Sequence, residues 1–487
     1  MSAQDALLGL LAIPALGAVG IWFTGRRPNL RESVTLATAI GLFLCAVAVL
    51  MDLQAGATPT LVLAEPIPGI PLALHAEPLG VLFALLASGL WVVTSVYAIG
   101  YMRAKRETHQ TRFYVCFAIA LCGAMGVALA GNLVTLFVFY EVLTLSTYPL
   151  VAHAGNENAV RGARTYLGIL LTTSIGLLLP AIVWTYSLAG SVEFTPGGIL
   201  AGKAGPVETT LLLALFVLGT GKAAVMPVHR WLPAAMVAPT PVSALLHAVA
   251  VVKAGVFTIT KVILYIFGTD YLAGIPAERL LVYLAGFTVI AASVVALRQD
   301  NFKRLLAYST IGQLSYIVLA ALVLTPFAEI GAAMHIVAHA FGKITLFFTA
   351  GAIYVAAGKT QVSQFDGIGR RMPWTMAAFT VGALSMAGVP PTAGFVSKWY
   401  MIAGAFQNDL YFVLAVLTLS TALNAAYFLP IIHRAFFRSE TVVPKHQHGE
   451  APWPMVAALV TTAALTLAFF VFNAPVVELE KALVKLP

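Results

Sequence analysis

The sequence predicts an all-α integral membrane protein of about fourteen transmembrane helices, with two inverted five-helix repeats and two broken helices. Three observations lead to this fold class. Of the 487 residues, 60% are hydrophobic and 10% are charged, whereas soluble domains carry about 25% charged residues. Apolar runs of about 20 residues, the length that a helix needs to cross a bilayer, recur along the whole chain. Glycines and prolines interrupt two of these runs next to a lysine.

The apolar runs define the expected spans in order. A transmembrane β-strand would have about ten residues of alternating hydrophobicity, so the longer runs favour helices. The expected spans lie near residues 6–25, 33–51, 78–102, 113–130, 132–153, 163–187, 208–228, 240–266, 278–297, 304–324, 328–357, 375–403, 410–432 and 453–473.

The lysines and arginines between the spans alternate between the two sides of the membrane. Of the 28, nineteen fall in odd-numbered connections, four fall in even-numbered connections and the C-terminal tail, and five lie inside spans. Because basic loops stay in the cytoplasm, we expect both termini to be non-cytoplasmic. Asp5 before the first span and Arg26 after it indicate a first span that is not cleaved. The net charge of +8 therefore reflects topology, and no nucleic-acid partner is expected.

Six charged residues lie in the interior of the expected spans, away from the span ends, where a charge at mid-membrane costs at least about 3 kcal/mol. Glu141 is the one acid in the middle of a span. Such residues normally face a protein interior or water and pair with one another. Lys261 is set apart, because it lies late in its helix and can reach the interface or pack structurally. Removal from water disfavours the charged form of a lysine, so the other four are candidate proton carriers: Lys222, Lys253, Lys343 and Lys398.

The seventh span contains the most informative stretch, in which Gly219 and Pro227 flank Lys222. Proline removes a backbone donor and clashes with the preceding turn, so we expect a broken helix near the lysine. A broken helix at membrane depth is tolerated only where it is buried in protein or lines a polar cavity. Two histidines farther along the same stretch, His229 and His247, are accessory candidates for the path.

The twelfth span repeats this device, with Gly388 and Pro390 before Lys398. The two breaks lie five spans apart, and because five is odd, a duplicated five-helix unit enters the membrane inverted. Paired interruptions of this kind are typical of inverted-repeat transporters, so we assign spans 4–8 and 9–13 to two repeats. The expected units are an N-terminal three-helix segment, the two repeats, and a C-terminal helix with its tail: 1–111, 112–266, 267–434 and 435–487.

The eleventh span carries His335, His339 and Lys343. Steps of four residues advance about 400° around a helix, so the three side chains share one face. A zinc site, a polar core and a proton relay are the alternatives. We favour the relay, because histidine accepts and donates protons near neutral pH and no further metal ligand lies nearby in sequence.

No metal or cofactor is expected. The cysteines form no CxxC motif and no cysteine/histidine cluster, so iron–sulfur and zinc sites are unsupported. Nucleotide, flavin and quinone motifs are absent from the sequence, and any redox coupling would come from other subunits. The three cysteines, Cys45, Cys116 and Cys122, all lie inside apolar runs.

Glu141 has no neutralising neighbour in its own span, so its partner must come from another helix. Lys222 is the first choice and Lys253 the second, with contact made directly or through one water. Opposite charges within about 4–6 Å stabilise both ionised forms. Four basic residues at the cytoplasmic ends of spans either feed protons inward or, the interpretation we favour, are solvated loop residues: His153, Arg161, Arg164 and His229.

At these motifs the sequence resembles the antiporter-like membrane subunits shared by the Mrp cation/proton antiporters and respiratory complex I. The resemblance covers the fourteen-span core and is strongest from about residue 130 to 400. Key residues of that family are a glutamate in span five, a lysine in seven, a lysine or histidine in eight, histidine and lysine positions in eleven, and a lysine or glutamate in twelve. The matching residues here are Glu141, Lys222, Lys253, His335, His339, Lys343 and Lys398.

Within this family we interpret the resemblance as pointing to the D subunit of the Mrp antiporters. Lys398 argues against the complex I member that has glutamate at this position, and we expect no long lateral helix after span fourteen. A membrane-bound hydrogenase subunit and the membrane partner of an inorganic-carbon uptake complex stay open. The resemblance implies protons entering from the cytoplasm between spans 7 and 8, passing to Lys398, and leaving by a second half-channel.

Two functional classes follow from the resemblance. The first is a subunit of a secondary Na⁺/proton antiporter, which is not an enzyme. The second is a proton-pumping subunit, without its own redox site, of a complex I-like NADH:quinone oxidoreductase or a hydrogenase. Both imply the cytoplasmic membrane of a bacterium or archaeon, other membrane subunits as partners, and protons, with Na⁺ in the first class, as the transported ions. The interior lysines disfavour an inert scaffold.

Overall fold

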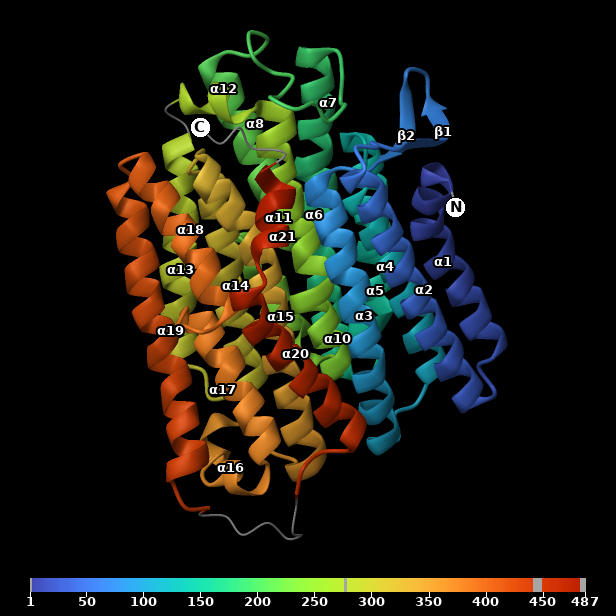
Figure 1. Ribbon diagram of the computed structural model, residues 1–487, viewed down its shortest axis with the longest axis vertical. Helices are drawn as coiled ribbons and strands as arrows, with labels where there is room; N and C mark the ends of the chain where they lie inside the picture. The colour runs from blue at the N-terminus through green and yellow to red at the C-terminus, as the bar shows by residue number, and fades with distance from the viewer. Residues whose placement is uncertain (1, 276–277, 441–448, 482–487) are drawn as a thin grey trace.

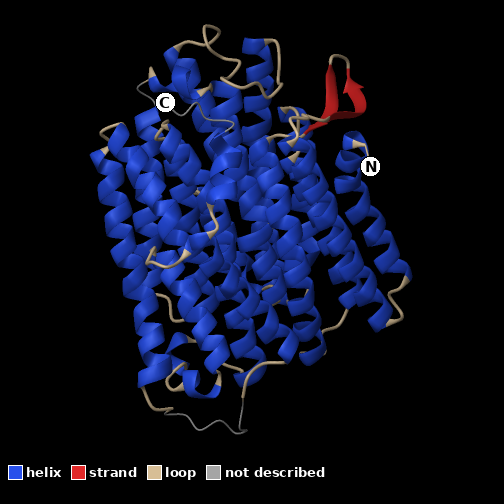
Figure 2. Cartoon of the chain, viewed as in Figure 1, coloured by secondary structure: helices blue, strands red, loops and turns tan. Residues whose placement is uncertain are grey.

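The computed structural model describes residues 2–275, 278–440 and 449–481, which form a bundle of nearly parallel helices (Figures 1 and 2). A two-stranded antiparallel hairpin, β1 (Thr60–Ile67) and β2 (Ile70–His75), projects from one end. The C-terminal end of α3 (Pro78–Ala104), which carries Arg103, lies at the opposite end. These ends are termed the hairpin end and the basic end. The helical membrane fold class is confirmed, and the hairpin is a feature that the sequence analysis did not predict.

The first half of the chain forms mostly long helices. A π-helical turn, η1 (Ser174–Leu178), joins the two parts of the sixth expected span. The helices are α1 (Ala3–Phe23), α2 (Pro28–Gln54), α3 (Pro78–Ala104), α4 (Gln110–Ala128), α5 (Leu133–Val151), α6 (Glu157–Thr173), α7 (Leu179–Ala189) and α8 (Pro206–Gly219).

Residues 221–273, from the end of the seventh expected span to just beyond the eighth, are divided into short pieces. They comprise η2 (Gly221–Ala223), η3 (Val228–Arg230), α9 (Trp231–Ala234), η4 (Ala235–Val237), α10 (Thr240–Ala244), the π-helical η5 (Leu245–Val249), α11 (Val251–Val262), the π-helical η6 (Ile263–Phe267) and α12 (Thr269–Ala273).

The second half returns to long helices around a second interruption. Its elements are α13 (Glu278–Leu297), α14 (Phe302–Ala321), α15 (Pro326–Ala357), η7 (Val362–Gln364), α16 (Ile368–Arg371), α17 (Pro373–Ala387), α18 (Ala393–Gln407), α19 (Tyr411–Phe437), α20 (Trp453–Val471) and α21 (Ala474–Lys481). Glycines in the left-handed conformation end α15 and α17, with φ of 67° at Gly358 and 80° at Gly388, as is usual at helix C-termini.

Within the described ranges, ten helices are long and apolar enough to cross a membrane. The expected spans outside this set are the divided seventh, eighth and twelfth, and the more polar α14. The total of fourteen spans, the inverted repeats, the unit boundaries and the side of the membrane that each end faces therefore stay predictions.

Helix α15 is the centre of the bundle. It packs against α14, α17, α18 and α20. Of the residues in its most apolar 18-residue stretch, 94% are buried. Polar side chains on α15 consequently face protein rather than lipid, and His335, His339 and Lys343 are all fully buried.

Both expected helix breaks are confirmed. Helix α8 ends at Gly219, and Lys222 follows in the 3-10 turn η2. Helix α17 ends at Ala387, and α18, which carries Lys398, begins at Ala393. A Cβ on Gly394 would lie 1.8 Å from the carbonyl oxygen of Ser385, so only glycine lets the two parts of this span approach so closely.

Candidate functional site

Lys222 is fully buried and points at helix α5. Its Nζ donates to the carbonyl of Tyr140 at 2.9 Å and to the hydroxyl of Thr144. The Tyr140 hydroxyl in turn accepts the backbone N–H of Lys222 at 3.1 Å. The broken span is therefore fastened to α5 by the lysine itself, through neutral groups.

Glu141 follows Tyr140 on α5, and both of its carboxylate oxygens are buried without a hydrogen-bond partner among the described residues. The predicted direct ion pair with Lys222 is wrong. Tyr140 and Thr144 lie one turn apart and present their oxygens to η2, whereas Glu141 is rotated about 100° around the helix. Glu141 still acts on the charge of Lys222 through space, and a pair bridged by one water stays a prediction.

Lys253 on α11 reaches across to α15. Its Nζ lies 2.7 Å from Nδ1 of His339, and both side chains are fully buried. Helix α11 also packs closely on the broken seventh span, because a Cβ on Gly255 would lie 2.3 Å from the backbone nitrogen of Ala223. Glycine at this position therefore places Lys253 next to the segment that carries Lys222.

His335 lies one turn before His339 on α15, with 6.3 Å between the ring centroids. Both of its ring nitrogens have partners. Nδ1 lies 2.8 Å from the hydroxyl of Ser397, and Nε2 lies 2.9 Å from Oε1 of Gln313. Gln313 Nε2 donates to the carbonyl of Met386 at 3.2 Å. The histidine thus connects α15 to both sides of the break in the twelfth span.

Lys398 binds the open C-terminal end of α17. Its Nζ donates to the carbonyls of Met386 and Ala387 at 3.0 and 3.1 Å, and to the hydroxyl of Thr421 at 3.2 Å. The last carbonyls of a helix lack partners within the helix and carry partial negative charge. The break in the twelfth span therefore creates the binding site for its own lysine.

Lys343 points away from the break toward α14 and α19. Its Nζ donates to the hydroxyl of Ser309 at 2.8 Å, which also accepts from Tyr427 at 3.0 Å. Tyr427 contacts Asn424 in turn. Lys343 thus forms a side branch, two turns along α15 from His335.

The structure joins most of the predicted site residues into one buried series, here termed the central line. Lys253 contacts His339, the ring of His339 lies near that of His335, and His335 is linked through Gln313 and the Met386 carbonyl to Lys398. Lys222 and Glu141 are not part of the central line. Lys343 forms the side branch toward Ser309.

Uncharged partners of the buried lysines and of His335 were missed by the sequence analysis, which followed charges alone. Gln313 is a glutamine in the middle of a span, and Ser397 directly precedes Lys398. Thr144 lies one turn from Tyr140. Isolated amides and hydroxyls in spans are a usable signal when they lie beside a buried lysine, because each buried donor needs an acceptor.

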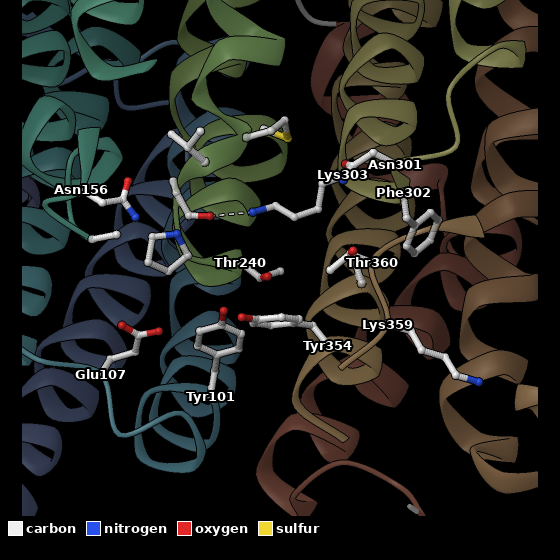
Figure 3. A pocket seen from close by; sticks show the side chains of 16 residues that line it. Tyr101, Glu107, Asn156, Thr240, Asn301, Phe302, Lys303, Tyr354, Lys359 and Thr360 are labelled. Carbon is white, nitrogen blue, oxygen red and sulfur yellow. Dashed lines mark hydrogen bonds between the residues drawn. The ribbon is translucent and has the colours of Figure 1, made fainter. Parts of the chain in front are cut away.

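A cavity of about 380 Å³ lies at the basic end of the bundle, where α10 begins. Figure 3 shows the hydroxyls of Tyr101 and Tyr354 pointing into it beside Thr240. Lys303 lines it as well, with Nζ donating to the carbonyl of Ala238 at 2.6 Å. From Thr240, which lines the cavity, the chain runs through η5 to α11 and Lys253.

The accessory histidines have different surroundings. His229 is half-buried on η3, where its ring lies 6.5 Å from that of Tyr308. His247 lies in η5, and its side chain is outside the described part of the structure. The sequence analysis favoured a solvated His153, and this expectation is wrong. His153 is buried beside Phe113, and burial lowers its pKa to about 4.

Lys261 lies outside the central line, at the hairpin end of α11. It does not reach the interface, because it is 1% exposed. Its Nζ lies 2.6 Å from a carboxylate oxygen of Glu77, the residue before α3. This buried partner was missed, since Glu77 falls just outside an expected span.

The chain matches a described protein family over the part that holds this geometry. Residues 130–424 match the family described as NADH:quinone oxidoreductase/Mrp antiporter, TM. NADH-quinone oxidoreductase subunit N of Desulforudis audaxviator is 31% identical over 456 residues, which cover 89% of this chain and 90% of that protein. The D subunit of the Na(+)/H(+) antiporter of Alkalihalophilus pseudofirmus is 28% identical over 465 residues, which cover 94% and 92%.

A solved structure has the same fold over nearly the whole chain. A chain of the Mrp complex from Dietzia sp. DQ12-45-1b matches with a TM-score of 0.89, covering 99% of this chain and 97% of that chain. The two sequences are 22% identical, so this likeness concerns the fold.

Proposed function

The chain belongs to the NADH:quinone oxidoreductase/Mrp antiporter transmembrane family, and we propose that it moves protons across the membrane along the central line, as one subunit of a larger complex. One observation carries the proposal. Buried proton-binding side chains follow one another from Lys253 through His339 and His335 to Lys398, across the centre of the bundle.

The contact between Lys253 and His339 suits proton transfer. Lys253 and His339 share a hydrogen bond of 2.7 Å, along which a proton moves from the ammonium to Nδ1, leaving a neutral amine and an imidazolium. The cavity beside Thr240 supplies protons from the basic end, which the charge distribution predicts to be cytoplasmic.

His335 has a defined acceptor atom. Gln313 must turn its nitrogen to the Met386 carbonyl, because a carbonyl only accepts, so its oxygen faces Nε2 of His335 and that nitrogen carries the hydrogen. Nδ1 is then the acceptor, facing Ser397. When Nδ1 gains a proton, the Ser397 hydroxyl turns to the carbonyl of Gly394, which lies 3.1 Å away. The serine thus serves both protonation states.

We propose, more specifically, that the chain is the D subunit of an Mrp-type Na⁺/proton antiporter. Lys398 in the twelfth span and the similarity over 94% of the chain to the D subunit of a Na(+)/H(+) antiporter support this. The second candidate is a proton-pumping subunit of a quinone-linked complex, which the 31% identity to an oxidoreductase subunit N favours.

Isolation of the intact complex tests both proposals. A tagged chain is purified with its partners, reconstituted into vesicles, and assayed for proton movement driven by a Na⁺ gradient. We expect Na⁺-dependent flux that Lys398→Ala abolishes and that Lys203→Ala, at an exposed loop, leaves intact. Iron–sulfur or flavin subunits in the complex, with flux driven only by electron donors, would favour the second candidate. No flux under either condition would contradict both.

A further inference from the structure

A second group of buried charges lies at the hairpin end, apart from the central line. The ammonium of Lys261 contacts Glu77 at 2.6 Å and donates to the carbonyl of Ala130 at 2.7 Å. Glu329 in the first turn of α15 and Glu480 on α21 complete the group, with exposures of 9% and 3%. These four charged residues, Lys261, Glu77, Glu329 and Glu480, are termed the hairpin-end cluster.

The charges of this cluster do not balance. Three carboxyl groups accompany one ammonium group, and an uncompensated buried charge is costly. The Glu480 carboxyl lies within electrostatic reach of Glu77 and Glu329, and its Oε1 is buried without a hydrogen-bond partner among the described residues. Because Glu77 is already neutralised by Lys261, the remaining negative charge must be removed at Glu329 and Glu480.

The surroundings of Glu480 favour its protonated form. Helix α21, which is not among the candidate spans, packs on α3 and α15, and burial, with Glu77 and Glu329 nearby, raises the pKa of Glu480 to about 8. Other titratable groups surround the cluster. Tyr265 lies next to Glu77, Asp270 acts on Glu329, His75 on β2 lies near Glu77 and Lys261, and Tyr400 lies near Lys481 on α21.

One face of α11 connects the cluster to the central line. Lys253, Phe257 and Lys261 follow at steps of four residues, so they share a face, and the two lysines are about 12 Å apart along the axis. Phe257 lies between them and packs on Phe83 with 5.2 Å between ring centroids. This aromatic pair has no proton donor or acceptor, so it separates the two sites, and the charge of the cluster acts on Lys253 across about 12 Å of buried protein.

We propose that the hairpin-end cluster is a second proton-binding site, whose protonation sets the charge that acts on Lys253 from the hairpin end, with α21 as its cover. This inference rests on the proposed function of the line. A proton suits the site better than Na⁺, because the Lys261 ammonium already occupies Glu77 and would repel another cation, whereas protonation of Glu480 only cancels a charge.

The test uses two acids on the same helix. Glu480 is buried, whereas Glu478 is exposed and pairs with Lys481 at 2.7 Å. In vesicles that contain the assembled complex, we expect Glu480→Gln to flatten the pH dependence of proton flux, while Glu478→Gln behaves as wild type. The infrared band of protonated carboxyl groups should lose one component, titrating near pH 8, in Glu480→Gln alone.

Three results would overturn the proposal. An unchanged pH profile of flux in Glu480→Gln, while Lys398→Ala is inactive, would show that the cluster does not act on the central line and would leave the line itself standing. A band unchanged by Glu480→Gln would show that Glu480 holds no proton. A titration that shifts when NaCl replaces choline chloride would assign the site to Na⁺ instead. Loss of flux in wild type itself would contradict the proposed function and not the cluster alone.

Discussion

Nζ of Lys253 and Nδ1 of His339 lie 2.7 Å apart, and this contact links α11 to α15 at the buried centre of the bundle. The two helices belong to different predicted repeats. The contact therefore joins the halves of the chain by a bond that can carry a proton, and the integrity of the central line depends on how closely α11 is held in place.

The first prediction concerns Gly255, which lets α11 approach the broken seventh span. Its added Cβ would lie 2.3 Å from the nitrogen of Ala223 and 2.4 Å from the carbonyl carbon of Lys222. Because backbone cannot yield as a side chain does, Gly255→Val should lower the free energy of unfolding by about 1–3 kcal/mol or more. Thermal unfolding of the purified complex measures this. Gly168→Ala on α6, where nothing lies within 4 Å, is the control, and equal stability of the two variants would refute the packing argument.

The second prediction concerns Gln313, which bridges His335 and Met386. Gln313→Leu keeps a similar volume but leaves the Nε2–H of His335 without its acceptor, at a cost of about 1–3 kcal/mol. The Met386 carbonyl keeps Lys398 as a donor. Chemical unfolding should show this loss, whereas Gln299→Leu, in the loop just after α13, should change stability little. An unchanged unfolding midpoint in Gln313→Leu would mean that the amide does not support the histidine.

The third prediction separates the hydroxyl of Ser397 from its volume. Ser397→Ala removes the group that serves both protonation states of His335 and should slow proton flux about tenfold, which corresponds to about 1.4 kcal/mol in the barrier. Ser397→Thr keeps the hydroxyl and should retain most of the flux. Proton flux is measured across a pH series, with Ser187→Ala at an exposed position as the control. The same flux profile in Ser397→Ala and Ser397→Thr would exclude this role of the hydroxyl.

The fourth prediction is a pH dependence of the docking of α21. The folded-state pKa of Glu480, about 8, lies above its ordinary value of 4.5, so the docked helix binds the proton more tightly than the released one. Docking is therefore strongest at low pH, weakens as pH rises from about 4.5 to about 8, and is constant above that. Hydrogen exchange of residues 474–481, corrected for intrinsic rates, should lose at least about tenfold protection between pH 6 and pH 9. Glu480→Gln should abolish this change, and equal loss in both proteins would rule out Glu480 as its origin.

Sequence patterns were sufficient for the helical fold and for the two breaks. Long apolar runs have few alternatives in a bilayer, and glycine and proline act locally, so the interruptions at Gly219 and Gly388 were predictable. The membership of the antiporter-like family was likewise confirmed, because its motif places charged residues where chance would not.

Tertiary orientation was less accessible from sequence. The direct Glu141–Lys222 contact was predicted wrongly because the orientation of α5 about its own axis decides which oxygens face η2. Neighbouring residues along the helix point about 100° apart, and no local sequence pattern determines that orientation. Glu77 was missed because its burial comes from packing of α3, α11 and α21, which are distant in sequence. Gln313 and Ser397 contact His335 only because α14 and α18 pack against α15, and this packing is not visible in the sequence.

The most direct test of the central claim is proton flux in Lys253→Ala, Lys398→Ala and the double variant, in vesicles with the assembled complex. Serial carriers on one path predict that each single variant abolishes flux and that the double variant is no worse, so the effects are non-additive. Lys203→Ala should match wild type, and assembly should be unchanged in all four. Partial defects that simply add in the double variant, or normal flux in Lys398→Ala, would show that protons do not travel along the line from Lys253 to Lys398.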